Sequence, residues 1–503
     1  MSEHFDVLIV GAGLSGIGAA HHLQRRCPGK SYAILEAREA TGGTWDLFRY
    51  PGIRSDSDMH TLGYNFRPWT DRKSIADGDL ILDYIRDTAR EAGIDRRIRL
   101  QHKVVGAEWS SEEARWTVTV ERGDTGETLR MTCGFLYMCS GYYRYDQGYT
   151  PEFPGIERFG GTVVHPQHWP GDLDYVGKRV VVIGSGATAV TLVPAMAKDA
   201  AKVTMLQRSP TYVASMPAAD PVARFLHRFL PDRAVYSIVR WKNVLAQLAI
   251  YKLSRTRPGI LKKFLRRGVE RMLPPGYDVD THFTPRYNPW DQRLCLVPDA
   301  DLFKAIGDGS AEVVTDRIAG FDETGIELES GARLDADVVV TATGLNVLFL
   351  GDAELRVDGA EPDLARTWVY KGMMLNDIPN FAFALGYTNA SWTLKADLVA
   401  EYVCRLLNQI DAGGYDFCVP EVTDPSITEE PLLDFNSGYV LRALDGLPKQ
   451  GSKEPWKLRQ SYPYDLRAMR RGQLLDGTMQ FRRRPAAAQP APPALASAAS
   501  TPS

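Results

Sequence analysis

Apolar runs alternate with Ala- and Gly-rich helical stretches at two places in the chain, and this pattern predicts two copies of one unit. In the first copy, the apolar run 5–10 leads through a glycine turn into a helix over 14–26 and a second apolar run over 32–35. In the second copy, the run 180–183 is followed by a glycine turn, a helix and a strand over 202–207. Strand, tight turn, helix and strand within about thirty residues are the context that a dinucleotide site requires. The predicted fold class is therefore α/β, with two Rossmann-like dinucleotide-binding domains.

The first glycine turn is predicted to bind a dinucleotide with an unphosphorylated ribose. Its glycines allow close approach of the backbone to a pyrophosphate, and the helix that follows directs free N–H groups at that anion. A carboxylate at the end of the second strand accepts hydrogen bonds from ribose hydroxyls and repels a 2′-phosphate. The ligand is therefore FAD or NAD. The residues expected to contact it are Gly11, Gly13, Ser15, Gly16 and Glu36.

The second glycine turn is predicted to bind NADPH, which leaves FAD for the first. No carboxylate ends its second strand, where the chain reads Gln207-Arg208-Ser209. A guanidinium beside a hydroxyl matches a 2′-phosphate, and charge-assisted hydrogen bonds contribute roughly 1.5–3 kcal/mol each. The alternative is that Arg208 is an ordinary surface cation. The residues expected to contact NADPH are Gly184, Ser185, Gly186, Ala187, Thr188, Ala189, Gln207 and Arg208.

The length of 503 residues exceeds what one hydrophobic core organises, so we expect several domains. The hydrophobic content of 44% and the charged content of 24% are ordinary for a globular protein. A tail rich in Pro, Ala and Ser is expected to be disordered. The predicted segments are a first FAD-binding part (1–150), a linker (151–172), an NADPH-binding domain (173–345), a return to the FAD-binding domain (346–484) and the tail (485–503).

A helical, basic insertion is predicted at about 220–285, inside the second domain. Between Asp220 and Leu273 there are 13 Lys and Arg against three acidic residues, and Trp241, Leu245 and Leu248 form an apolar stripe. The simplest interpretation is a solvated cationic face, and the alternative is peripheral contact with a membrane. The net charge of −3 does not indicate a nucleic-acid partner. We therefore expect a cytoplasmic protein, either free or peripheral on the inner face of the cell membrane, and leave an oligomer open.

The cysteines and histidines do not form the spacings of a metal or redox centre. The six cysteines are widely spaced without a Cys-x-x-Cys pair, which argues against a zinc site, a disulfide framework and a dithiol relay. His165 and His168 lack an accompanying carboxylate or cysteine cluster, so no metal is expected. The strand pattern beginning near Phe5 leaves no room for a signal peptide, and no apolar run is long enough to cross a bilayer.

Two further motifs resemble those of type I Baeyer–Villiger monooxygenases. Residues 159–170 fit F-x-G-x-x-x-H-x-x-x-W-P, and residues 42–56 fit A/G-G-x-W-x-x-x-x-F/Y-P-G/M-x-x-x-D. The segments 43–56, 287–295 and 386–392 are similar to the subgroup that activates the prodrug ethionamide. The resemblance spans nearly the whole chain, from residue 5 to about residue 484.

The resemblance implies an FAD- and NADPH-dependent enzyme that inserts one oxygen atom of O₂ into ketones to give esters or lactones. It also implies oxidation of sulfides or thioamides. By the same resemblance Arg293 supplies a fixed positive charge at the oxygenation step, and Asp56 orients it; an arginine keeps its proton and offers several donors. Gln292 stands where ketone-oxidising relatives often carry Lys, which leaves Arg208 with more of the NADPH discrimination.

Other positions acquire expected roles from the resemblance as well. His165 and Trp169 are expected to couple the movement of the two domains, and Trp392 to shield the flavin ring. Arg54 and Ser55 are expected to contact NADPH. The further contacts expected with FAD are Thr44, Trp45, Asp46, Leu47, Asp56 and Val104.

Two other functions stay open. A monooxygenase that oxidises sulfur or nitrogen centres would use the same cofactors but would give no ester from a ketone. A non-catalytic sensor would bind FAD and NADPH without substrate-stimulated NADPH oxidation.

Overall fold

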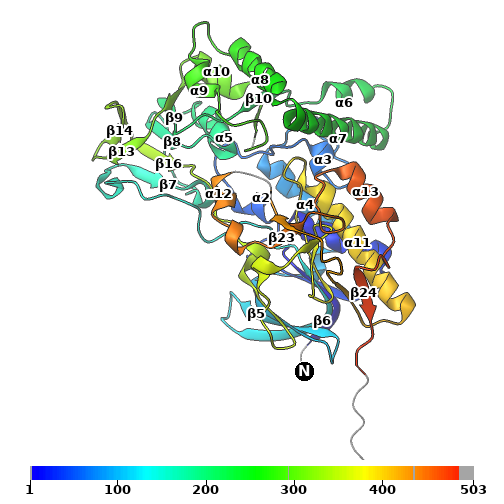
Figure 1. The fold of residues 1–503 in the computed structure, drawn as a ribbon. Coiled ribbons are helices and arrows are strands. Elements are labelled where there is room, and N and C mark those ends of the chain that lie inside the picture. Colours follow the sequence, from blue (N-terminus) through cyan, green and yellow to red (C-terminus); the bar gives the residue numbers. More distant parts are fainter. Residues whose placement is uncertain (1–2, 293, 434–436, 486–503) are drawn as a thin grey trace, which may run out of the picture.

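Two sheets organise the computed structural model, which describes residues 3–292, 294–433 and 437–485 (Figure 1). The first sheet has the order β17-β4-β5-β6-β1-β2-β3, with β20 beside β6. The pairs β6-β1, β1-β2 and β2-β3 are parallel, whereas β4-β5 and β5-β6 are antiparallel. Its strands are β1 (Glu3–Val10), β2 (Tyr32–Leu35), β3 (Ile98–Arg99), β4 (His102–Ser110), β5 (Arg115–Arg122), β6 (Thr128–Met138), β17 (Glu354–Val357) and β20 (Phe381–Phe383).

The second sheet is entirely parallel and has the order β12-β9-β8-β16-β7. Helix α5 (Ala187–Met196) packs against it together with α10 (Asp301–Gly307). The predicted linker over 151–172 differs from expectation in one respect, because β7 lies within it and forms the edge strand of this sheet. The strands are β7 (Thr162–Val164), β8 (Arg179–Ile183), β9 (Lys202–Gln207), β12 (Ala311–Thr315) and β16 (Val338–Thr341).

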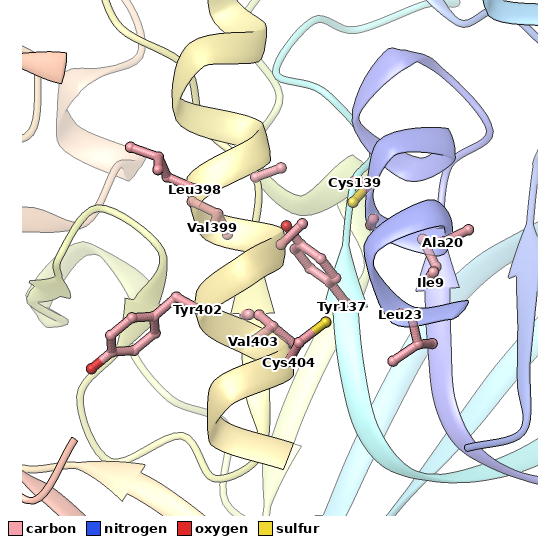
Figure 2. Close-up of a cluster of buried hydrophobic side chains, with 14 of the residues drawn as sticks. Ile9, Ala20, Leu23, Tyr137, Cys139, Leu398, Val399, Tyr402, Val403 and Cys404 are labelled. Carbon is pink, nitrogen blue, oxygen red and sulfur yellow. The ribbon is translucent and has the colours of Figure 1, made fainter. Parts of the chain in front are cut away.

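Strand β1 is buried on both faces, which explains its continuous apolar run. Val7 and Ile9 belong to one core cluster and Leu8 and Val10 to another. The first cluster lies under α1 (Leu14–Arg26) and α11 (Trp392–Gly413). Figure 2 shows these two helices beside Tyr137 at the end of β6. Helix α11 therefore returns the chain to the first sheet after the second sheet is complete.

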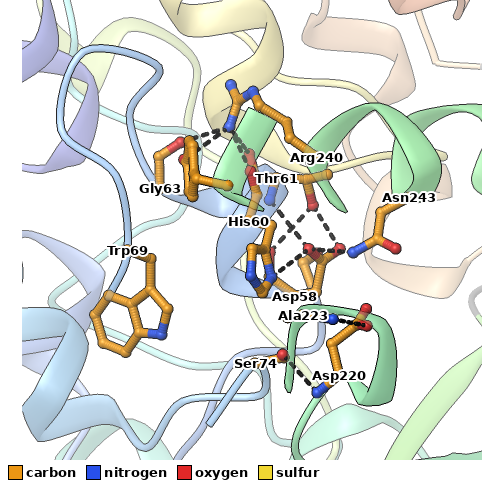
Figure 3. A network of polar contacts seen from close by, with 12 residues as sticks. Asp58, His60, Thr61, Gly63, Trp69, Ser74, Asp220, Ala223, Arg240 and Asn243 are labelled. Carbon is orange, nitrogen blue, oxygen red and sulfur yellow. Dashed lines mark hydrogen bonds and ion pairs between the residues drawn. The ribbon is translucent and has the colours of Figure 1, made fainter. Parts of the chain in front are cut away.

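The predicted helical insertion consists of α6 (Pro221–Leu226), α7 (Asp232–Thr256), α8 (Pro258–Met272) and α9 (Val279–Phe283). It is joined to the first unit through α3 (Met59–Leu62), which Asp58 caps at its N-terminus (Figure 3). The guanidinium of Arg240, on α7, donates to the carbonyl oxygens of His60 at 2.6 Å and of Gly63 at 2.8 Å. Asn243 donates to the Asp58 carboxylate at 2.7 Å. These contacts fix α7 against the segment that follows the 42–56 motif.

No helix in the described part of the chain is long and apolar enough to cross a membrane. All six cysteines are buried. The predicted tail falls outside the described residues from position 486 onward.

Candidate active site

A cavity of about 550 Å³ is lined by strands and loops of the first sheet and by α5, which packs on the second sheet. Gly11 and Gly13, after β1, lie on one side of it, and Ala187 and Thr188, at the start of α5, lie on the other. The segment of the 42–56 motif lies along the wall between them. The first predicted nucleotide turn and the start of α5 therefore open onto one shared space, whereas Gly184 and Gly186 of the second turn do not line it.

The first glycine turn leaves room for a ligand because side chains are sterically excluded from it. Gly11 has a φ of +104°, and a Cβ there would lie 2.5 Å from the carbonyl oxygen of Cys139. A Cβ on Gly43 would lie 3.1 Å from the Cα of Gly13, so the turn and the 42–56 motif touch backbone to backbone. This bare cradle at the N-terminus of α1 fits a pyrophosphate, as FAD requires.

Glu36 lies in the cavity wall at the end of β2, where the sequence predicts the ribose contact. Its carboxylate accepts the backbone N–H of Ala12 at 2.7 Å and that of Arg38 at 3.0 Å. Burial raises the pKa of this carboxyl. These bonds hold Glu36 in one orientation beside the cradle.

The residues of the 42–56 motif divide into two groups. Thr44 and Trp45 line the cavity together with Val104, whereas Asp46 and Leu47 do not belong to its wall. The side chain of Leu47 packs against the core of the second unit. The predicted direct FAD contacts by Asp46 and Leu47 therefore differ from their placement in the structure.

Three arginines donate hydrogen bonds to the carboxylate of Asp46, whereas the sequence predicts that this side chain contacts FAD. Arg38 donates to it at 2.7 Å, Arg49 at 2.9 Å and Arg86 at 2.8 Å. Asp46 is 2% exposed, so these partners compensate the burial of its charge. These contacts fix the short helix α2 (Thr44–Leu47), which carries Thr44 and Trp45.

Arg54, Ser55 and Asp56 all line the cavity. Nη1 of Arg54 donates to Asp301 at 2.5 Å, and its Nη2 is buried with no hydrogen-bond partner among the described residues. A buried donor without a partner is costly, and an anionic ligand in the cavity would satisfy it. Ser55 donates its hydroxyl to the carbonyl of Ser57 at 2.7 Å.

The predicted catalytic residue Arg293 lies outside the described residues. Leu296, three positions later, lines the cavity and belongs to β11 (Cys295–Pro298). Strand β11 pairs in parallel with β10 (Val213–Met216), which follows the second nucleotide unit. Strand β11, which begins two positions after residue 293, therefore reaches the cavity wall.

A side chain is sterically excluded from the second glycine turn, as it is from the first. Gly184 has a φ of +138°, and a Cβ there would lie 2.3 Å from the carbonyl oxygen of Ala342. The hydroxyls of Ser185 and Thr211 are 2.8 Å apart. Gly186 caps the N-terminus of α5, and Ala189 is fully buried one turn into the helix. From α5, Ala187, Thr188 and Thr191 line the cavity, and Ala189 does not.

Gln207 and Arg208 lie at the end of β9. Gln207 is buried, whereas Arg208 is exposed. The amide of Gln207 is buried and donates to the carbonyl of His282 and to the hydroxyl of Thr315, both at 2.8 Å. The side chain of Gln207 thus joins β9 to the helical insertion, whereas the sequence predicts that it contacts NADPH. Arg208 is exposed and does not line the 550 Å³ cavity.

Trp392 connects the start of α11 to the first glycine turn. Its indole N–H donates to the Ser15 hydroxyl at 2.7 Å, and its ring stacks on Tyr142 with centroids 5.1 Å apart. Both rings line the cavity. Ser15 therefore accepts one hydrogen bond from Trp392 and keeps its own proton for a ligand.

Several cavity residues were not predicted from the sequence, above all Tyr142, Tyr145 and Arg38. The hydroxyl of Tyr145 lies 3.3 Å from that of Thr44. The aromatic residues after the small-residue turn at 139–141 were the signal that could have identified this wall, because β6 ends beside β1.

His165 contacts the backbone at two places. Its Nδ1 accepts the backbone N–H of Gln167 at 3.2 Å, and its Nε2 lies 3.2 Å from the carbonyl of Gly344. Burial lowers the pKa of this ring. The neutral imidazole joins the 151–172 segment to the chain that leaves β16. The described residues contain no group of three His, Cys, Asp or Glu side chains that could hold a metal ion.

Comparison with known proteins decides the family. Residues 66–244 match the model of the flavin-binding monooxygenase-like family, and residues 9–71 match that of an NAD(P)-binding Rossmann-like domain. The FAD-containing monooxygenase EthA of Mycobacterium tuberculosis is 59% identical over 487 residues, which are 97% of this chain and 99% of the relative. The chain belongs to the FAD-containing monooxygenases. Within this family, the probable FAD-binding monooxygenase AlmA of Acinetobacter baylyi is 48% identical over 484 residues, or 96% of this chain and 97% of the relative.

Solved structures of monooxygenases share the fold. A steroid monooxygenase bound to NADP superposes with a TM-score of 0.76 at 23% identity, covering 95% of this chain and all of the other. A cyclohexanone monooxygenase from Rhodococcus bound to NADP+ superposes with a TM-score of 0.70 at 20% identity, covering 84% of this chain and 87% of the other. The predicted monooxygenase family and the α/β class with Rossmann-like domains are thus confirmed.

Proposed function

We propose that this FAD-containing monooxygenase uses NADPH and O₂ to insert one oxygen atom into ketones, giving esters or lactones, and that it also oxidises thioamides or sulfides. The observation that carries the proposal is the cavity onto which the first glycine turn, the 42–56 motif and the start of α5 open. A steroid monooxygenase and a cyclohexanone monooxygenase of the same fold bind NADP, which supports NADPH as the second nucleotide.

The chain's own residues bind the nucleotides and shield the reacting centre. The 11–16 turn and Glu36 would hold the pyrophosphate and ribose of FAD, and Arg54 and Arg208 would bind phosphates of NADPH. Bound FAD, once reduced, supplies the activation of O₂ on which the reaction depends. Trp392 and Tyr142 exclude water from one side of the cavity. Water exclusion strengthens every charge interaction within such a site.

Arg293 is proposed as the catalytic cation and Asp56 as the carboxylate that orients it. Asp56 lines the cavity, and so does Leu296, close after Arg293 in the chain. A guanidinium keeps its charge across the working pH range and can stabilise a developing anion. Loss of one such donor typically costs about 10²–10³ in rate.

The proposal is tested by product analysis of Arg293→Ala. The purified protein, loaded with FAD, is supplied with NADPH and a panel of ketones and one thioamide. We expect esters from the unmodified protein, and a loss of about 10²–10³ in ester formation by the variant with flavin reduction intact. Arg286→Ala is the matched control, because Arg286 is exposed seven positions earlier. NADPH consumption that yields only hydrogen peroxide with every ketone would exclude ketone oxygenation, and the thioamide product would then distinguish a heteroatom-oxidising enzyme from a redox sensor.

The helical insertion is also proposed to contact an anionic membrane surface. Among the described residues, ten of the eighteen exposed large hydrophobic side chains lie between positions 222 and 264. Phe229 and Phe264 are 71% and 72% exposed. The excess of Lys and Arg in the same helices complements anionic lipid.

Vesicle flotation tests this contact. The protein is expected to float with vesicles containing phosphatidylglycerol and not with pure phosphatidylcholine. The double variant Phe229→Ser/Phe264→Ser should lose the binding, and Leu475→Ser, at a residue 58% exposed on another part of the chain, should keep it. Equal binding by both variants would contradict the proposal.

A further inference from the structure

Helices α1 and α11 lie side by side, and pairs of side chains join them at three levels. The pairs are Ser15 with Trp392 at 2.7 Å, His22 with Asp397 at 3.2 Å and Arg26 with Glu401 at 3.1 Å. Both partners advance along the chain from one pair to the next, so the two helices run in the same direction. Their first turns lie at the cavity wall, which Ser15 and Trp392 line.

Two cysteines meet at the other end of this helix pair. Cys27 follows the last residue of α1, and Cys404 lies on α11. Sγ of Cys27 is 3.6 Å from the backbone oxygen of Cys404 and 3.4 Å from Oδ1 of Asn408. The two thiols are also hydrogen-bonded to each other, and Figure 2 shows the sulfur of Cys404 on the side of α11 that faces α1. Because 377 positions separate the two residues, cysteine spacing in the sequence does not reveal the pair.

The cysteine pair lies just below the surface of the molecule. Cys27 is 5% exposed and Cys404 2% exposed. The residues on both sides of Cys27, at 25–26 and 28–29, are exposed. A reagent as small as water therefore has only a short distance to cover to the Cys27 sulfur, whereas a bulky reagent is excluded.

The two thiols differ in reactivity because of their contact. The hydrogen bond from the Cys404 thiol lowers the pKa of Cys27 against the effect of burial, and the ammonium of Lys30 acts in the same direction. The same contact raises the pKa of Cys404. The thiolate is the reactive form of cysteine, so Cys27 is the nucleophile of the pair. Burial raises the pKa of three other thiols, which are those of Cys133, Cys139 and Cys418.

We propose that Cys27 and Cys404 form a reversible disulfide when the protein meets hydrogen peroxide. The Cys27 thiolate attacks one oxygen of the peroxide, the O–O bond breaks, and Cys27 becomes a sulfenic acid while the other oxygen leaves as hydroxide and takes up a proton. The Cys404 sulfur then bonds to the Cys27 sulfur, loses its proton and displaces the oxygen as water. Two thiols thereby lose two electrons, one peroxide molecule gains them, and two water molecules form.

The disulfide would fasten the two helices whose first turns lie at the FAD-binding cavity. A covalent link between segments that are distant in the chain stabilises a fold mainly by restricting the unfolded chain. The proposal does not depend on which substrate the enzyme oxygenates, because added peroxide alone provides the oxidant.

Peptide mapping tests the disulfide directly. The purified protein, loaded with FAD, is treated with hydrogen peroxide, unfolded in the presence of iodoacetamide and digested with trypsin without reductant. We expect peptide 27–30 linked to peptide 396–405, lighter by two hydrogen atoms than the two thiol peptides together and separated by dithiothreitol. The other cysteines should carry the alkyl group and serve as the internal control. Recovery of both peptides only in alkylated form would overturn the proposal.

Two variants test which thiol attacks the peroxide. In Cys404→Ala the sulfenic acid on Cys27 has no thiol to react with, so dimedone, which reacts with sulfenic acids, should label peptide 27–30. In Cys27→Ala the remaining Cys404 should stay unlabelled, and equal labelling of the two variants would refute the assignment of Cys27 as the nucleophile. Cys418→Ala is the matched control at a buried thiol outside the pair, and it should form the linked peptide as the unmodified protein does.

Thermal release of FAD tests what the bond does to the fold. Flavin fluorescence on heating should appear a few degrees higher in the peroxide-treated protein than in the same sample after dithiothreitol. Cys27→Ala should show no such difference between the two treatments. An unshifted release temperature in protein that contains the linked peptide would refute the fastening of the two helices.

Discussion

At the scale of single residues, the site depends on charged side chains that are buried and paired. Glu36 could be predicted because its place after a glycine turn and a strand follows from spacing within one local unit. The role of Asp46 could not be, because Arg38, Arg49 and Arg86 reach it from three different segments of the chain. Pairing between distant segments leaves no local pattern in a sequence.

The choice between NADPH and NADH is predicted to depend on Arg208. Because a charge-assisted hydrogen bond contributes roughly 1.5–3 kcal/mol, Arg208→Ala should raise the KM for NADPH by about ten- to a hundredfold and leave that for NADH unchanged. Lys198→Ala, at an exposed cation beyond the opposite end of α5, serves as the control. Steady-state NAD(P)H oxidation measures both constants, and an equal rise for the two nucleotides would show that Arg208 does not read the 2′-phosphate.

The stability of the folded chain is predicted to fall in mild acid because of His21. Burial, assisted by the neighbouring His22, lowers the pKa of His21 from 6.5 to about 4, and its ring stacks on Phe66 at 3.5 Å. Between these two pH values the unfolded chain binds a proton that the folded chain does not, so stability is lost as pH falls through this window. His21→Phe should therefore show a smaller decrease in Tm from pH 7 to pH 5.

Thermal unfolding at several pH values measures this difference. The control is His4→Phe, at an exposed position in strand β1. The same decrease in Tm for the unmodified protein and for His21→Phe would assign the acid sensitivity to other groups.

At the scale of elements, the sequence predicted the regular units well and the short strands poorly. Helix α1 and strands β2 and β9 have the predicted bounds, because hydrophobic periodicity and glycine turns delimit them locally. Strands β17 and β20 have four and three residues and pair with β4 and β6, more than 200 positions earlier. Such short runs carry too little alternation to reveal their partners.

Helix α7 is predicted to depend on Arg240 for its attachment to α3. Arg240 is 4% exposed and holds two backbone carbonyls at the end of α3, and each buried acceptor left unpaired costs roughly 1–3 kcal/mol. Arg240→Met should therefore lower the Tm by several degrees, as measured by calorimetry. Arg233→Met, at an exposed position in the first turn of α7, should change it little. An unchanged Tm of the Arg240→Met variant would show that apolar contacts alone hold α7 against α3.

At the scale of the whole molecule, the chain leaves its first sheet, builds a second, and returns. The sequence predicts that the chain returns to the FAD-binding domain after position 345. In the structure, β17 and β20 join the first sheet beyond this position, and α11 follows them. The 380 Å³ cavity near the C-terminal segment could not be predicted, because its walls combine segments near positions 371, 386 and 460 that only the packed fold brings together. A cavity is a property of tertiary packing, whereas a glycine turn is a property of the local chain.

The measurement that tests oxygen insertion most directly is the fate of labelled oxygen. The protein, loaded with FAD, is supplied with NADPH, a ketone and ¹⁸O₂, and the products are identified by mass. We predict an ester that carries one ¹⁸O atom, formed with the consumption of one NADPH. Labelled hydrogen peroxide without any labelled ester, for every ketone supplied, would contradict the account.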